Sequence, residues 1–357
     1  MAEPYPSPRA DPREELERLR TALDSGAETA LVIETSGSTG APKRVPQSAR
    51  ALLASARASA AWLDGQGQWL LCLPTRYIAG ENVLVRSIAA GTEPVYLPEG
   101  HFDPGAFRDA AGAMTGESRY VSVVPTQLQR LLDAVPADAE LLVALRSFDA
   151  VLVGGGPTRS RLLEIADELG VRVVRTYGSS ETCGGCVYDG HPLPGVRLRI
   201  SAAGEVEVTG PVLTTGYLDD PERIARSFAI DPDGTRWYRT GDLGTLAADG
   251  TLSISGRRDS VIISGGEKVL LELIEEAVTA LPGLADAVVV ALDDDEWGQV
   301  PVVVTTGTAD LAGVRAAVGG SLGRAAQPAR VITVAGIPLL PSGKPDRQRL
   351  AADLSSR

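Results

Sequence analysis

Short apolar runs alternate with helical segments from residue 30 to residue 174, and this alternation constrains the fold most strongly. Strands that are buried on both faces read as continuous apolar runs, and helices in the connections cover both faces of a parallel sheet. We therefore expect a largely parallel sheet, with ligands bound beyond the carboxyl ends of its strands. The expected strands are 30–33, 69–73, 95–97, 120–124, 150–153 and 171–174, and the expected helices are 11–25, 47–63, 79–89, 104–114, 127–134 and 158–169.

The pattern changes after Gly195. Segments 197–200, 205–209 and 251–255 are short and alternate in polarity, with Gly and Asp turns between them, which predicts an antiparallel β subdomain. Beyond Asp259, helices at 270–281 and 312–322 mix with strands at 287–291, 300–305 and 330–334. We expect an α/β protein with a large N-terminal domain (1–258), which holds mostly parallel sheets flanked by helices plus the small β subdomain. A small, mobile α+β C-terminal domain (259–357) completes it.

Composition excludes several classes of function. The chain has 357 residues, a net charge of −12 and no basic cluster, which argues against nucleic acid as a partner. No apolar run approaches the ~18 residues of a membrane helix, and the start lacks the features of a secretory signal, so a cytoplasmic protein is expected.

Cysteine usage fits a reducing compartment, because the chain has only three cysteines. Cys183 and Cys186 could form a redox pair or half of a zinc site. Only Cys72, His101 and His191 remain as further ligands, so we favour small residues that line an acceptor pocket.

The segment 35–43 reads Thr-Ser-Gly-Ser-Thr-Gly-Ala-Pro-Lys and follows the apolar run 30–33. Such a loop can bring backbone N–H groups, hydroxyls and one ammonium to a phosphate chain. It differs from the Walker A pattern because Pro42 stands between the glycine and Lys43. The alternative is a solvated linker. We expect the order strand, phosphate loop, helix.

Four further motifs follow the loop in order. They are Tyr-Gly-Ser-Ser-Glu-Thr at 177–182, Tyr-Arg-Thr-Gly-Asp at 238–242, Gly-Arg-Arg-Asp at 256–259 and Pro-Ser-Gly-Lys at 341–344. Together with the loop, their order and spacing resemble the adenylate-forming enzymes, which comprise acyl-CoA synthetases, luciferases and adenylation domains. The resemblance extends from about Ala30 to the end of the chain.

This resemblance implies a two-step reaction. A carboxylate attacks the α-phosphate of MgATP, pyrophosphate leaves, and the acyl-adenylate passes to a second nucleophile, usually the thiol of CoA. The implied partners are a small-molecule acid, ATP and CoA, with Mg²⁺ as cofactor, and we expect a monomer or homodimer.

The resemblance also implies roles for individual residues. The residues that would bind the phosphates are Thr35, Ser36, Ser38, Thr39 and Lys43. Gly155, Gly156 and Pro157 would form the turn against which adenine lies, with Tyr177 and Gly178 beside it. Asp242 would bind the ribose hydroxyls, and Arg257 would bind ribose or phosphate. Glu181 would hold Mg²⁺, which suits a hard cation that prefers oxygen ligands, and Thr182 would contact the α-phosphate.

Motion is a further implication of the resemblance. Lys344 of the small domain would enter the site as the catalytic cation of adenylation and then leave. Asp259 would be the hinge, and segment 264–269 would swing in to line a thiol channel. Arg258 is expected to face solvent.

The acid is indicated by a closer resemblance. Segments 79–80, 83–87, 122–125 and 182–189 resemble the short actinobacterial form of o-succinylbenzoate–CoA ligases, which serve menaquinone synthesis. The implied substrate is an aromatic acid with a second carboxylate, with which Arg86 or another basic group could pair. The implied acyl pocket contains Tyr77, Ala79, Gly80, Arg86, Ser179 and Gly184.

The chain departs from these relatives near that pocket. Tyr77 takes the place of a histidine, and Glu81 and Asn82 replace apolar or amide residues. A glutamate at the pocket would repel a dianionic acid unless Arg76 or Arg86 neutralised it. Arg44 also replaces the glycine that usually follows the loop lysine.

Three hypotheses about activity therefore stand. The chain could be a CoA ligase for an o-succinylbenzoate-like acid, or an adenylating ligase that uses another acid and a non-CoA nucleophile such as an amine. It could also be a catalytically silent relative. The presence of Lys43, Glu181, Asp242 and Lys344 argues against the silent form.

Overall fold

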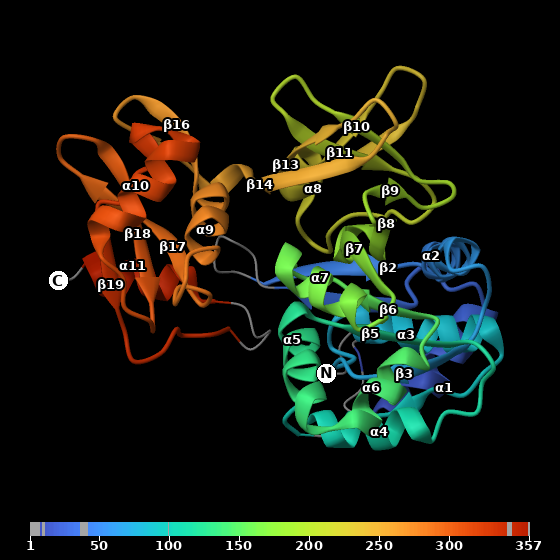
Figure 1. Ribbon diagram of the computed structural model, residues 1–357. Coiled ribbons are helices and arrows are strands. Elements are labelled where there is room, and N and C mark those ends of the chain that lie inside the picture. Colours follow the sequence, from blue (N-terminus) through green and yellow to red (C-terminus); the bar gives the residue numbers. More distant parts are fainter. Residues whose placement is uncertain (1–7, 9–10, 36–41, 99, 341–344, 356–357) are drawn as a thin grey trace. The chain divides into compact units, whose positions relative to one another are not determined.

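The computed structural model describes residues 8, 11–35, 42–98, 100–340 and 345–355. The chain forms two compact units (Figure 1). The first comprises Met1–Arg199, Glu207–Thr240 and Ala247–Leu252, and the second comprises Ile200–Val206, Gly241–Leu246 and Ser253–Arg357. The domain boundary and hinge at Asp259 stay predictions.

A seven-stranded sheet forms the centre of the first unit. Its strand order is β4-β3-β5-β6-β7-β8-β9, in which β3 pairs with β4 and β5 in parallel, as do β5 with β6 and β6 with β7. β8 and β9 add antiparallel pairs at one edge. The largely parallel sheet is confirmed. The strands are β3 Gln68–Leu71, β4 Val95–Tyr96, β5 Arg119–Val123, β6 Ala150–Val153, β7 Val173–Ser179, β8 Gly184–Tyr188 and β9 His191–Pro192.

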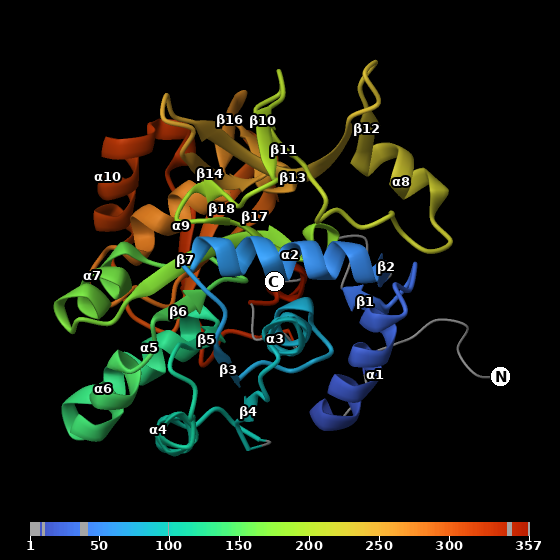
Figure 2. The same ribbon diagram turned by 90° about the vertical axis from the view of Figure 1, so that its right-hand side faces the viewer.

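Alternate strand residues point to opposite faces and bury two layers of helices. Leu70, Val121 and Val151 share a buried cluster with α4, α5, α6 and α7, which lie together on one side in Figure 2. The other face contacts α2 and α3, and α1 packs against both of these helices. The helices are α1 Pro12–Asp24, α2 Ala49–Trp62, α3 Ile78–Ala90, α4 Pro104–Gly112, α5 Pro125–Ala134, α6 Ala139–Arg146 and α7 Ser160–Glu168.

Helix α3 is buried on every side from Gly80 to Ser87. Gly80 permits its close approach to the preceding turn, because an added Cβ would lie 2.4 Å from the Pro74 carbonyl oxygen. A helix in this position must bury its polar residues too, and each of them needs a partner or an altered charge.

Glu81 of α3 faces α1. Its side chain is fully buried, and the described residues offer its two carboxylate oxygens no donor. Burial, and then the charge of Glu15, raise the pKa of Glu81 to about 9, against the opposing charge of Arg18. Arg18 itself pairs with Glu15 and donates a 2.7 Å hydrogen bond to the Ala30 carbonyl. Glu81 is therefore a neutral acid within the α1–α3 contact, and the charged groups that act on it are Glu15 and Arg18 rather than Arg76 or Arg86.

Replacing Glu81 with glutamine should flatten the dependence of stability on pH. The folded protein binds this proton more tightly than the unfolded chain does. The stabilisation of the folded state by this bound proton is therefore complete below ~4.3, the pKa of a glutamate in the unfolded chain. It is lost as the pH rises toward 9, the pKa of Glu81 in the folded protein. Glutamine stays neutral, so Glu81→Gln should be more stable than the parent at pH 8 by about 2 kcal/mol and nearly equal to it at pH 4.5.

Urea unfolding at both pH values measures this difference. Glu17→Gln is the matched control, because Glu17 lies on the exposed side of α1. Equal effects of Glu81→Gln at the two pH values would contradict a proton held on Glu81.

The phosphate loop joins two antiparallel strands, β1 Leu31–Thr35 and β2 Lys43–Gln47. The expected order of strand, loop and helix is thus wrong, because a second strand precedes α2. Proline and two basic residues in β2 hide its strand character, although Val45 is fully buried. Helix α2 begins only after Ser48, whose hydroxyl accepts a hydrogen bond from the Ala51 N–H.

A five-stranded sheet follows the first one along the chain. Its order is β10-β11-β13-β12, with β14 paired to β13. The expected strands 197–200 and 205–209 match β10 and β11. The long strand β13 was not expected, because its residues lack a clean alternation of polar and apolar side chains. The elements are β10 Arg197–Ile200, β11 Glu205–Thr209, α8 Pro221–Ser227, β12 Phe228–Ile230, β13 Arg236–Leu246 and β14 Leu252–Arg257.

The remaining sheet lies in the second unit and confirms the α+β prediction. Its order is β16-β15-β18-β17, with β19 parallel to β18. Helices α9 and α10 cover one face and α11 covers the other. The elements are β15 Val261–Ser264, β16 Glu267–Leu270, α9 Leu271–Thr279, β17 Val288–Asp294, β18 Gly298–Thr305, α10 Leu311–Leu322, β19 Arg330–Thr333 and α11 Arg347–Ser355. Across the described parts of the chain, no helix has both the length and the apolar character needed to cross a membrane.

Candidate active site

Lys43 and Glu181 form an ion pair in the first unit. Lys43 begins β2 directly opposite Thr35, so these two residues flank the phosphate loop as cross-strand partners. The Lys43 Nζ lies 2.5 Å from Glu181 Oε1. Ser36, Ser38 and Thr39, the other expected phosphate ligands, lie outside the described residues. The hairpin thus brings the loop lysine to the expected metal ligand, although 138 positions separate them in the chain.

Glu181 is an ionised carboxylate despite its burial. Its side chain is 1% exposed, on the short helical turn η2 Ser180–Thr182. Burial opposes the charge, but the Lys43 ammonium and the Tyr217 hydroxyl hold the pKa of Glu181 below its usual value. An anionic oxygen ligand of this kind fits the coordination preference of Mg²⁺.

Tyr217 was not expected from the sequence. Its hydroxyl donates a 2.8 Å hydrogen bond to Glu181 Oε1, and Lys43 Nζ lies 5.8 Å from the centre of its ring. Its ring is buried with Val45, Phe228 and Tyr238. The only signal for this position was a tyrosine after Gly216, which carries no charge pattern, so chemistry could not be assigned before the fold placed it.

The turn after β7 is shaped by glycine and by Thr182. Strand β7 shifts register against β8 between Tyr177 and Gly178, an irregularity often found beside active sites. A Cβ on Gly178 would lie 2.0 Å from the Gly184 carbonyl oxygen, so only glycine fits. The Thr182 hydroxyl accepts from the Ser179 N–H at 2.9 Å and donates to the Gly184 carbonyl at 2.7 Å. Thr182 therefore holds this turn together, and its contact with the α-phosphate stays a prediction.

A set of buried side chains supports the same turn from behind. Gln47 donates to the Ser180 carbonyl at 2.6 Å, and Asn82 and Ser55 donate to the Cys183 carbonyl at 2.7 and 3.2 Å. Asn82, a departure from the relatives, thus binds backbone at the turn. Gln47 and Ser55 were not singled out in the sequence, because polar residues on a strand and a helix give no functional signal.

The two neighbouring cysteines belong to this packing. Burial raises the pKa of both thiols, that of Cys186 to about 12. The Cys183 thiol donates to Gln47 Oε1 at 2.8 Å. Thiolate is the form that binds metals and reacts with disulfides, so these geometries favour a structural role.

Arg86 carries a buried positive charge on α3 and lines a small cavity with residues that include Ser59, Trp69 and Ala89. Tyr77, Ala79 and Gly80 lie at the start of α3, and Arg86 lies further along the same helix. Arg86 is 7% exposed, stacks 4.7 Å from the centre of the Trp69 ring and donates to the Tyr188 hydroxyl at 2.9 Å. Among the described residues, no carboxylate pairs with its guanidinium, and its Nε has no acceptor.

The expected adenine turn follows β6. Gly155 has a φ of +81°, and a Cβ on Gly154 would lie 2.2 Å from Thr176 Oγ1. The backbone there requires glycine, and Gly156 and Pro157 are exposed. Tyr177 is half-buried on the adjacent strand β7.

The expected ribose and hinge residues lie together in the second unit. Asp242 Oδ1 lies 3.0 Å from Arg257 Nη1, and Asp259 Oδ1 lies 3.3 Å from Arg257 Nε. Although burial opposes its charge, Asp242 and Asp259 hold the pKa of Arg257 above its usual value. Lys344, the expected catalytic cation, lies outside the described residues.

Comparison with known proteins agrees with these motifs. The family model of the AMP-binding enzymes matches residues 3–218, and that of the AMP-binding enzyme C-terminal domain matches residues 273–344. A probable 2-succinylbenzoate–CoA ligase of Mycobacterium tuberculosis is 40% identical over 342 residues, which cover 93% of this chain and 86% of the relative.

Solved structures give the same picture. The o-succinylbenzoate CoA synthetase of Bacillus subtilis in complex with its acyl-adenylate intermediate superposes with a TM-score of 0.79 at 29% identity, over 90% of this chain and 69% of that one. An amide bond synthetase of Marinactinospora thermotolerans superposes with a TM-score of 0.79 at 28% identity, over 92% and 69% of the two chains. The matched family models, the relative at 40% identity and the shared fold establish that this chain belongs to the AMP-binding, adenylate-forming enzymes.

Proposed function

We propose that the protein is an ATP-dependent 2-succinylbenzoate–CoA ligase that works through an acyl-adenylate and releases AMP and pyrophosphate. The relative at 40% identity carries that activity in its name, and so does the Bacillus subtilis structure. The observation in this chain that carries the proposal is the buried guanidinium of Arg86, which no carboxylate among the described residues pairs.

An arginine buried to this degree normally pairs with an anion, because an isolated charge is costly to remove from water. Arg86 has a ring on one side and a phenol on the other, but the described part of the chain offers its guanidinium no carboxylate. An acid with a second carboxylate would supply the missing anion, and the planar guanidinium suits bidentate pairing. The neutral Glu81 faces α1, so it does not oppose such a dianion.

The residues of the first unit would handle the phosphates and the metal. Bound Mg²⁺ would offset the negative charge of the triphosphate, and Glu181 is the carboxylate that fits it. Lys43, now paired with Glu181, would turn its ammonium toward the phosphates, while the Tyr217 hydroxyl keeps the carboxylate oriented. Asp242, a residue of the second unit, would accept hydrogen bonds from the ribose hydroxyls.

Pyrophosphate release across a panel of acids, with and without CoA, tests this proposal. We expect acid-dependent release with 2-succinylbenzoate, weak release with benzoate and formation of a CoA thioester. Release with another acid only would overturn the substrate. An amide product from an added amine, with no thioester, would favour the second hypothesis, which the likeness to the amide bond synthetase supports.

Lys344→Ala should lower the rate of adenylate formation from acid and ATP by about 10²-fold or more. The variant should still convert a supplied acyl-adenylate to the thioester, because Lys344 is assigned to the first step alone. Single-turnover assays of the two half-reactions measure this. A normal rate of adenylate formation would remove Lys344 from the mechanism.

A further inference from the structure

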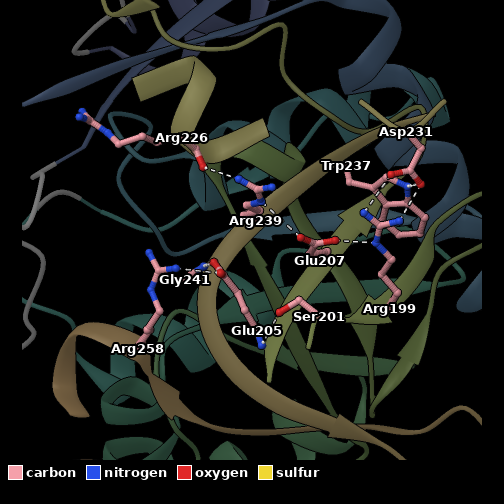
Figure 3. A network of polar contacts seen from close by, with 10 residues as sticks. All are labelled: Arg199, Ser201, Glu205, Glu207, Arg226, Asp231, Trp237, Arg239, Gly241 and Arg258. Carbon is pink, nitrogen blue, oxygen red and sulfur yellow. Dashed lines mark hydrogen bonds and ion pairs between the residues drawn. The ribbon is translucent and has the colours of Figure 1, made fainter. Parts of the chain in front are cut away.

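Glu205 divides its two carboxylate oxygens between two motifs of the second unit. It begins β11 and is 5% exposed. Oε1 accepts a 2.8 Å hydrogen bond from the Gly241 N–H, and Oε2 lies 3.0 Å from Arg258 Nη1. Figure 3 shows both contacts converging on this one side chain. Arg258 is 64% exposed, as expected, and its guanidinium still reaches this buried carboxylate.

These contacts close a ring around the expected ribose ligand. Gly241 has a φ of +76°, and an added Cβ would lie 3.0 Å from Arg257 Nη2, so the backbone here is held under that guanidinium. The next residue, Asp242, pairs with Arg257, which precedes Arg258 in the chain. The ring thus runs from Glu205 through Gly241 and Asp242 to Arg257 and Arg258, and back to Glu205.

Glu207 provides an internal comparison. It follows two residues later on the same strand and has the same 5% exposure. Its carboxylate pairs with Arg199 and Arg239, and Arg199 continues to Asp231 (Figure 3). None of these three residues belongs to the ring. The two glutamates therefore share burial, strand and ion pairing. They differ in what they bind within the Tyr-Arg-Thr-Gly-Asp motif, because Glu205 accepts from the Gly241 N–H next to Asp242, whereas Glu207 pairs with the side chain of Arg239.

We propose that Glu205 is a positioning residue of the nucleotide site, which orients Asp242 toward the ribose hydroxyls through the Gly241 N–H. The inference rests on the proposed function, because it takes Asp242 as the ribose ligand. Loss of the carboxylate would leave the Gly241 N–H without its acceptor and free the turn that carries Asp242. Affinity gained from the 2′-hydroxyl would then fall, whereas contacts to adenine and phosphate would remain.

The ratio of the affinities for AMP and 2′-deoxy-AMP measures this orientation without any acid substrate. A hydrogen bond to a charged acceptor is worth about 1.5–3 kcal/mol, so the parent protein should prefer AMP by about 10-fold or more. Glu205→Ala should reduce that preference to under about 3-fold. Glu205→Gln should keep it, since an amide oxygen can still accept from Gly241.

Glu207→Ala is the matched control and should keep the parent preference even if its melting temperature falls. If Glu205→Ala fails to fold, Glu205→Asp replaces it, because the shorter carboxylate cannot reach Gly241 and should lose the preference. A parent-like preference in Glu205→Ala or Glu205→Asp, or an equal loss in Glu207→Ala, overturns the inference. If the parent itself bound neither nucleotide, the proposed function would fail instead.

Discussion

Glu181→Gln should lower acid-dependent pyrophosphate release by about 10²- to 10³-fold, the usual size of the effect when one electrostatic contact to a developing charge is lost. The amide keeps the shape of the side chain and can still accept from the Tyr217 hydroxyl. It cannot supply the negative charge that a hard cation requires, and it leaves the Lys43 ammonium without its partner. The Mg²⁺ concentration needed for half-maximal rate should rise together with the loss of rate.

The control uses a second ion pair of the same hairpin. Arg44 pairs with Asp219 at the surface, so Asp219→Asn should leave the rate within about 2-fold and change stability by about 0–1 kcal/mol. Melting curves would show whether Glu181→Gln is folded at the assay temperature. A folded Glu181→Gln variant that retains a third of the parent rate would exclude Glu181 as the metal ligand.

Arg86→Ala should lower kcat/KM for 2-succinylbenzoate by about 10²-fold, since truncating one partner of a buried charge pair costs about 2–5 kcal/mol. Benzoate, which lacks the second carboxylate, should lose far less, so the selectivity between the two acids should collapse. Arg86→Lys should restore part of the rate, because it keeps the charge but loses the planar fork.

Arg76→Ala is the control for this experiment. Arg76 also carries a guanidinium near the start of α3, but it is exposed and stacks on the Tyr77 ring at 4.9 Å. We expect it to leave the selectivity unchanged. Parallel losses for both acids in Arg86→Ala would show that Arg86 supports the fold rather than the second carboxylate.

Much of the architecture could be predicted from the sequence. Apolar runs such as 150–153 marked β6 to the residue, and the turn residues beyond Gly195 marked β10 and β11. These elements follow from local burial patterns, which the sequence carries directly. The sequence does not predict β2 and β13, because their residues lack a clean alternation of polar and apolar side chains. These strands form by pairing with other strands, and that pairing is not visible in their own residues.

The residues of the site likewise fall into those that the sequence identifies and those that only the fold reveals. Lys43, Glu181, Asp242 and Arg257 were identifiable because charged residues stood in ordered motifs, and the fold places them in pairs, Lys43 with Glu181 and Arg257 with Asp242. Tyr217 and Glu205 gave no such signal. A tyrosine or a strand glutamate acquires a role only when folding brings its oxygen within hydrogen-bond distance of a distant group.

By itself, the sequence determined the family, the α/β class and the residue types available to bind a nucleotide, because spacing and polarity are properties of the chain. Only the tertiary structure decided the charge of Glu81, the burial of Arg86 against Trp69 and Tyr188, and the binding of Glu205 to two motifs. Those properties depend on desolvation and on contacts between distant segments, and neither exists before the chain folds.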